Sequence, residues 1–355
     1  MALTRYTDGD IVVSTDKVIT STWTNNTNNL TDHFTSSRQG GQEAGFTSPT
    51  SSGQFYVDVL QELSSSATAE VQYAVAYGNR VGSGSPDFTN DTGSFGVGAS
   101  RAVYNQYRQL VFGDEGQDFT FSSHTPDDFY VINVNRSRFK HALKPGTLNL
   151  HISGGIGDGT GMTGPLKLTD DSVTATGSAV ITNLGRQFNL VSGSNGLVSG
   201  SNINQKGNSS SYGLFYPDAG IIILNPDNFD SGIIPARNSG LSTNTDRNHV
   251  TLARHIKDAS SAGVGNFILD SEEKVTSQYY FTRAKNNEYN YTTNPSFQDE
   301  SGNLNFTSMI DNPQTYITTV GLYNDSNDLV AVAKLSQPVA KDFTKEALIR
   351  VKLDY

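Results

Sequence analysis

The sequence of 355 residues contains no cysteine, and only 17% of its residues are charged. The absence of cysteine excludes disulfides, thiolate zinc sites, iron–sulfur clusters and cysteine nucleophiles. The stability of the folded chain must therefore come from packing or from assembly with other chains.

The chain also lacks basic clusters and long apolar runs. Its 25 Lys and Arg are outnumbered by 35 Asp and Glu, so we expect no nucleic-acid partner. No stretch approaches the roughly 20 apolar residues of a membrane span, and the N-terminus has no apolar signal segment. We therefore expect no membrane partner and a chain made in the cytoplasm.

Serine, threonine, asparagine and 34 glycines are abundant, beside 16 Tyr and 18 Phe. The small polar residues favour strands and turns over helices, and the aromatic residues supply large apolar surfaces for a core. We expect a mainly β fold with a few helices (α+β), built from antiparallel sheets or β-sandwich-like units with long surface loops. The longest loops are expected at 36–54, 79–98 and 154–164.

Residues 1–153 are expected to form an N-terminal α+β domain. Alternation predicts neighbouring strands at 55–63 and 69–78, and helical spacing predicts a helix over 101–113 with Val103, Tyr107, Leu110 and Val111 on one stripe. Further elements are expected as strands at 11–19, 127–136 and 147–153 and a short helix over 136–146.

The remainder divides by composition into two expected domains. Residues 154–245 are a Gly-, Ser- and Asn-rich β insertion or middle domain, and residues 246–355 are a C-terminal β domain with a helix at 247–261. In the C-terminal domain YITTVGLY and LVAVAKLS flank the turn sequence NDSND, which predicts a hairpin. The last residues alternate, with Ile349, Val351, Leu353 and Tyr355 on one expected apolar face.

No motif for catalysis or cofactor binding stands out. GGIGDGTG at 154–161 follows no βαβ pattern, and Asp158, Asp170 and Asp171 lack the spacing of a calcium loop. The six histidines are scattered, and no G-x-S-x-G or spaced carboxylate pair occurs. We expect no cofactor, no metal, no catalytic residue and no enzymatic activity.

The C-terminal segments carry a family resemblance. NNEYNYTTNPSF at 286–297 and TYITTVGLYNDSNDLVAVAKLSQPVAKDFTKEALIRVKLDY at 315–355 resemble virion structural proteins of large contractile-tailed bacteriophages, notably those that infect cyanobacteria. The segment ITTVGLYNDSNDLVAVAKL is also similar to a core sequence of phage tail-fibre proteins. It has Asn327 and Asp328 where fibres usually have a glycine turn.

The resemblance implies a tail or baseplate subunit that contacts other virion proteins in a homo- or hetero-oligomeric particle, located in the virion after assembly in the bacterial cytoplasm. The alternatives are a capsid or neck decoration protein, a tail-fibre adaptor that binds host glycan, and a hydrolase of surface polysaccharide. The expected partner surface centres on 288–294, for which a core β-turn is the alternative. Its residues are Tyr289, Asn290, Tyr291, Asn294, Tyr323 and Asn324.

Overall fold

The computed structural model describes residues 4–24, 29–30, 35–36, 55–62, 66–84, 98–114, 116–153, 166–174, 179–198, 211–229, 248–261, 267–290 and 294–355. They form a mainly β protein with antiparallel sheets and few helices, which confirms the expected fold class. The long loop expected at 154–164 lies outside these residues, as does all of 36–54 except Ser36, while 79–98 is described only at 79–84 and 98. No helix in the described ranges is both long and apolar enough to cross a lipid bilayer.

The chain divides into two compact units. The terminal unit comprises Met1–Lys17 and Lys274–Tyr355, and the sheet unit comprises Val18–Glu273. The chain passes between them twice, within β1 (Ile11–Ser21) and β16 (Asp270–Ala284). This division differs from the expected domains 1–153, 154–245 and 246–355, because strands from all three pair in one sheet: β8 pairs with both β9 and β15.

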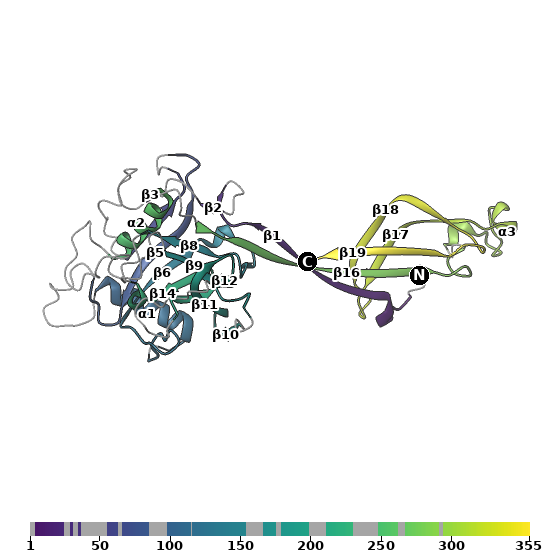
Figure 1. Ribbon diagram of the computed structural model, residues 1–355. Coiled ribbons are helices and arrows are strands. Elements are labelled where there is room, and N and C mark those ends of the chain that lie inside the picture. The colour runs from purple at the N-terminus through teal and green to yellow at the C-terminus, as the bar shows by residue number, and fades with distance from the viewer. Residues whose placement is uncertain are drawn as a thin grey trace. The chain divides into compact units, whose positions relative to one another are not determined.

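The sheet unit is built on one curled sheet of 13 strands (Figure 1). The defined registers in it are all antiparallel. Its main path runs, in spatial order, through β2 (Asn29–Leu30), β15 (Phe267–Ile268), β8 (Asn149–Ile152), β9 (Leu166–Asp170), β11 (Gly185–Ser194), β13 (Gly213–Tyr216), β14 (Ile221–Leu224), β6 (Asp128–Val134), β5 (Val71–Asn79), β4 (Tyr56–Leu60) and β3 (Thr35–Ser36). Two short strands, β10 (Val180–Thr182) and β12 (Leu197–Val198), also pair with β11.

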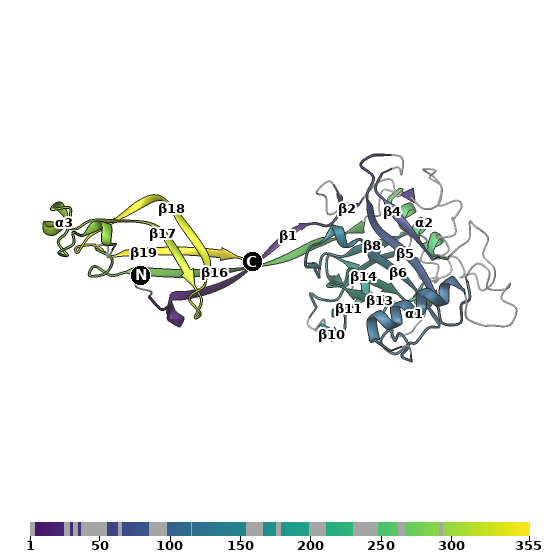
Figure 2. The same ribbon diagram turned by 180° about the vertical axis from the view of Figure 1, so that it is seen from behind.

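Apolar side chains cover both faces of this sheet. Along β6, Tyr130 and Ile132 join the core cluster that contains α2 (Asn248–Ser261), whereas Phe129 and Val131 join the cluster that contains α1 (Ala99–Phe112). The two helices therefore cover opposite faces, and both are drawn against the sheet in Figure 2. This explains why the central strands have almost continuous apolar sequences.

The segment 136–146, expected to be a short helix, is instead a single 3₁₀ turn η4 (Arg136–Arg138) followed by β7 (Ala142–Leu143). The Asn135 side chain accepts a hydrogen bond from the Ser137 backbone N–H and so closes the turn. Beyond it, β7 pairs with β16, which takes the chain out of the helical conformation. A second 3₁₀ turn, η5 (Pro226–Asn228), follows β14.

The terminal unit stacks a hairpin on a sheet (Figure 1). The sheet has the order β1, β16, β19 (Ala347–Asp354), and the hairpin pairs β17 (Thr315–Tyr323) with β18 (Leu329–Lys341). Their shared core contains four buried apolar side chains, which are Val320, Leu322, Ile349 and Val351. Three short helical segments complete the unit: η1 (Asp8–Asp10), η6 (Pro295–Phe297) and α3 (Ser308–Asp311).

The C-terminal strand follows its expected alternation in part. Ile349 and Val351 are buried and Leu353 is partly buried, as predicted. Tyr355 is 69% exposed because it lies beyond the end of β19, so it does not belong to the buried face.

Candidate functional site

The turn of the β17–β18 hairpin is closed by its own polar residues. The backbone N–H and the side-chain amide of Asn324 donate to the backbone and carboxylate oxygens of Asp328, and Asn324 Oδ1 accepts from the Asp328 N–H at 2.8 Å. Asn327 has φ 64°, a left-handed conformation that asparagine tolerates better than most residues. Asn327 can therefore occupy this left-handed turn position without being glycine, and Asn324 shapes the turn.

The two faces of this hairpin differ in burial. Val320 and Leu322 point into the core, whereas Tyr323 pairs with Leu329 on the opposite face, where both side chains are exposed. The register also places Gly321 opposite Val332 on that outer face, and Val332 is 57% exposed. The alternation of a strand thus puts large apolar side chains in solvent.

Gly321 leaves room for the Tyr323 ring close to the backbone of the hairpin. A Cβ at position 321 would come within 3.0 Å of the Tyr323 ring and 3.3 Å of Leu329, so the two side chains meet over the glycine backbone. The absence of a side chain at 321 therefore joins Tyr323 and Leu329 into one continuous apolar surface.

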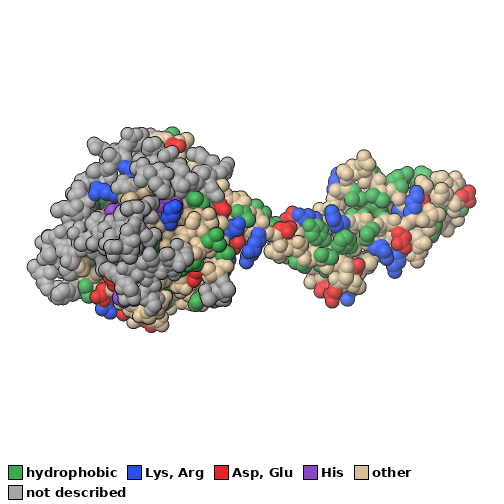
Figure 3. Space-filling view, viewed as in Figure 1, with side chains coloured by type: hydrophobic (Ala, Val, Ile, Leu, Met, Phe, Trp, Pro, Cys, Tyr) green, Lys and Arg blue, Asp and Glu red, His purple; other side chains and the backbone are tan. Residues whose placement is uncertain are grey.

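We call the exposed residues Tyr323, Leu329, Val330 and Val332 the hairpin face. Their exposed fractions run from 41% for Tyr323 to 66% for Val330. Together they expose on the order of 400 Å² of apolar surface, which matches the largest patch of a typical monomer and is often functional. Figure 3 shows that hydrophobic side chains gather on the surface of the terminal unit.

The residues expected around 288–294 do not form one surface. Tyr289 is exposed, has φ 52°, and its hydroxyl lies 3.0 Å from Thr4 Oγ1. Asn290 is only 2% exposed and bonds inside the unit, so it is not available to a partner and fits the alternative of a core turn. Asn294 caps η6 by accepting from the Ser296 N–H, and Tyr291 lies outside the described residues.

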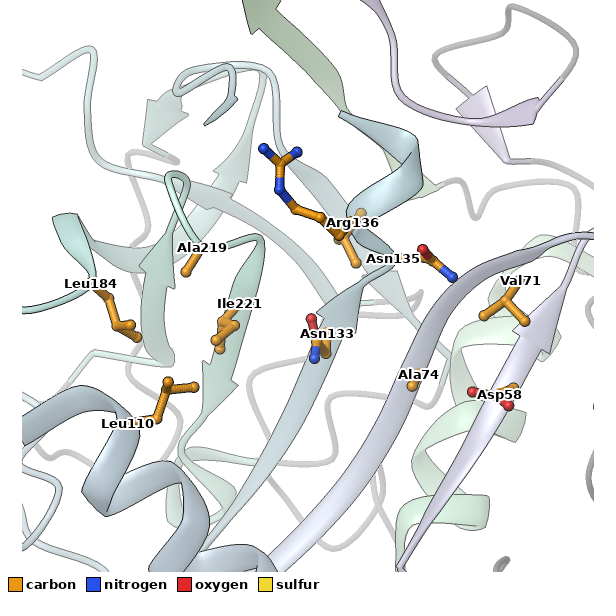
Figure 4. Close-up of a pocket in the computed structure, with 11 residues that line it drawn as sticks. Asp58, Val71, Ala74, Leu110, Asn133, Asn135, Arg136, Leu184, Ala219 and Ile221 are labelled. Atoms are coloured by element: carbon orange, nitrogen blue, oxygen red, sulfur yellow. The ribbon is translucent and has the colours of Figure 1, made fainter. Parts of the chain in front are cut away.

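A cavity of about 480 Å³ lies on the sheet unit, between β4, β5, β6, β14 and the exposed side of α1 (Figure 4). Its polar lining residues already have partners in the protein. The Arg136 guanidinium donates to the backbone oxygens of Phe139 and Lys140, and the Asn135 side chain closes η4. The lining includes one carboxylate, Asp58, and is otherwise largely apolar. The polar groups of this cavity are thus already engaged within the protein, so the hairpin face is the stronger candidate for binding.

The described acidic residues considered for calcium binding have structural roles. Both carboxylate oxygens of Asp170 accept from the Gly146 N–H at 2.9 Å, and burial raises the pKa of this carboxyl. Asp171 accepts from the backbone and side chain of Asn189. Across the described ranges no three His, Asp or Glu residues gather into a metal-binding group. Asp158 and the glycine-rich segment 154–161 lie outside those ranges.

No known protein family, curated protein or solved structure matches this chain. The hairpin face is apolar and lies on two paired antiparallel strands. These are the properties of a surface that binds another protein.

Proposed function

We propose that this protein is a structural component of a bacteriophage virion, a tail or baseplate subunit that holds neighbouring tail proteins through protein–protein contacts. The observation that carries the proposal is the hairpin face, where four large apolar side chains lie in solvent on the side of the hairpin opposite its core. Covering such a surface removes apolar area from water, which drives association by roughly 25 cal/mol per Å² before the costs of binding.

The resemblance to phage proteins involves the same residues. The segment similar to tail-fibre sequences, 317–335, contains most of β17, the turn and half of β18. Within it Val320 and Leu322 are core residues, and Tyr323, Leu329 and Val332 form the hairpin face. The sequence that supports the phage assignment is thus also the sequence that builds the exposed surface.

Incorporation into particles tests the proposal. Variants Leu329→Lys and Val332→Lys place a charge on the hairpin face without touching the core, so we expect a folded subunit whose incorporation into particles falls at least tenfold. Ile181→Lys is the matched control, because Ile181 is 75% exposed on β10 of the sheet unit. Incorporation is measured by quantitative mass spectrometry of purified particles from cells that produce each variant.

Three outcomes would overturn the proposal. The protein could be absent from purified particles, the hairpin variants could be incorporated as well as the control, or the isolated chain could cleave host surface polysaccharide. The last outcome would favour the hydrolase alternative, and binding of the intact polysaccharide without cleavage would favour the adaptor alternative.

A further inference from the structure

The terminal unit contains a lysine in a place where charged side chains are rare. Among the described residues the largest fully buried side chains are aromatic, with the single exception of Lys341, which is 1% exposed. Lys341 is the last residue of β18 and pairs with Thr315. Lysines are almost never fully buried unless paired, so this residue needs an explanation.

The partners of Lys341 are neutral oxygens from one loop. Nζ donates to Asn290 Oδ1 at 2.7 Å and to the Asn286 backbone oxygen at 3.3 Å. Asn290 is itself 2% exposed, and its Nδ2 donates to the same Asn286 oxygen at 2.7 Å. The amine of Lys341 and the carboxamide of Asn290 are therefore held together, out of solvent, around one backbone carbonyl.

An ammonium ion in this place lacks the usual compensation. No carboxylate of the described residues forms an ion pair with Lys341. A buried charge that is bonded only to neutral acceptors is costly, whereas a buried amide with its hydrogen bonds satisfied is not. A reaction that converts the amine into an amide would remove this cost.

The geometry brings the two reacting atoms within range. The Asn290 Cγ carbon is bonded to Oδ1 at about 1.2 Å, so it lies at most about 3.9 Å from Lys341 Nζ. Reacting atoms in a near-attack arrangement are about 3 to 3.5 Å apart, so this pair stands close to that arrangement.

We propose that Lys341 and Asn290 form an intramolecular isopeptide bond. The Nζ lone pair attacks Cγ, and the C–Nδ2 bond of the carboxamide breaks. One Nζ proton moves to Nδ2 and the leaving group departs as ammonia, so the amine and primary amide become a secondary amide and ammonia with no oxidant or reductant. The Asn286 oxygen, bonded to both nitrogens, keeps nucleophile and leaving group adjacent during the transfer.

The bond would supply what the composition of the terminal unit lacks. It joins positions 51 residues apart in a chain without cysteine, across a unit whose core has four buried apolar side chains. Such a cross-link restricts the unfolded chain as a disulfide does.

Intact-mass spectrometry of the denatured full-length protein tests the proposal. We expect a mass below that of the sequence by one ammonia, about 17 Da. Tryptic digestion should yield a branched peptide that joins 286–334 to 335–345, because the modified Lys341 is no longer cleaved. We also expect the terminal unit to melt on the order of 10 °C above that of an Asn290→Ala variant.

Controls separate this bond from other losses of ammonia. Lys341→Met should have its full sequence mass, whereas Lys345→Met, four residues along and exposed, should keep the deficit. A full-length protein with its complete sequence mass overturns the proposal even if Lys341→Met fails to fold. A deficit that persists in Lys341→Met, or a branched peptide at other residues, overturns it as well.

Discussion

The two units of this chain cover their sheets in different ways. In the sheet unit both faces of the sheet are covered, by α1 on one side and α2 on the other, so large apolar clusters form on each face. In the terminal unit a hairpin and a sheet share one small core, and their outer faces are bare. The two units therefore differ in how completely their sheets are covered by other elements of the chain.

The largest expected effect comes from removing β19. Deletion of residues 348–355 removes Ile349 and Val351, two of the four buried side chains of the terminal core, and each is worth roughly 1.5 to 3 kcal/mol when buried. We expect the terminal unit to unfold while the sheet unit stays folded. Limited proteolysis with mass mapping should show new cleavage within 1–17 and 274–347, and a truncated protein that gains no cleavage there would contradict this expectation.

A core substitution in the sheet unit should have a smaller but still large effect. Phe129 is 1% exposed and stacks on Tyr104, with ring centroids 5.0 Å apart. Phe129→Ala should destabilise the sheet unit by about 3 to 5 kcal/mol through lost transfer energy and a residual cavity. Urea unfolding followed by circular dichroism measures this, with the exposed Ile181→Ala as control. A change below 1 kcal/mol would mean that the face under α1 is loosely packed.

Low pH should change the stability of the two units by different amounts, and by less than the substitutions above. In the terminal unit, hydrogen bonds to the carboxylates lower the pKa of Asp10, Asp299, Asp342 and Asp354. A lowered pKa in the folded state contributes stability above the unfolded pKa of about 3.9, and this is lost as the pH falls through the folded value.

The buried Asp170 of the sheet unit behaves in the opposite sense. Burial raises the pKa of Asp170, so its contribution favours the folded state at low pH and declines as the pH rises through the raised value. Calorimetry over roughly pH 5 to pH 2, the range in which carboxyl groups titrate, should show the melting temperature of the terminal unit falling further than that of the sheet unit. Parallel shifts of both transitions would contradict this difference.

The smallest effect is expected at Leu110 on α1. The periodicity of the sequence places it on the buried stripe, but the side chain is 44% exposed, whereas Val111 beside it is 1% exposed. Leu110→Gln should change the free energy of unfolding by less than about 0.5 kcal/mol, and Val111→Ala should cost more. Chemical denaturation of both variants is sufficient, and a large loss in Leu110→Gln would show that the helix is seated differently.

Much of the fold was predictable because period and turn chemistry act locally. The strands at β5 and β6, the helix α1 with its left-handed Gly113 end, and the hairpin turn all follow from the sequence. The prediction of a helix over 136–146 was wrong because the conformation of this segment depends on pairing with β16, more than 120 residues away. The strand β13 was missed because its four residues carry too little periodicity to distinguish it from a loop.

The candidate surface was predictable only in part. The position of Tyr323 on one face of its strand follows from alternation. The local sequence does not show that no other element of the described chain covers that face. Asn290 was misplaced for the same reason, since its burial depends on Lys341. Lys341 itself gave no signal, because a lysine at the end of a polar strand is ordinarily solvated.

Because the chain crosses between the units in both β1 and β16, the sheet unit is inserted in sequence between the two segments of the terminal unit. The core of the terminal unit combines residues from both of its segments. Tyr6 packs on Tyr280, with ring centroids 5.6 Å apart, and Ile349 and Val351 belong to the same core. During synthesis on the ribosome, the sheet unit is complete once residue 273 has emerged, whereas the terminal unit is complete only after β19 has emerged. The core beneath the hairpin face is therefore completed only after all residues of the sheet unit have been synthesised.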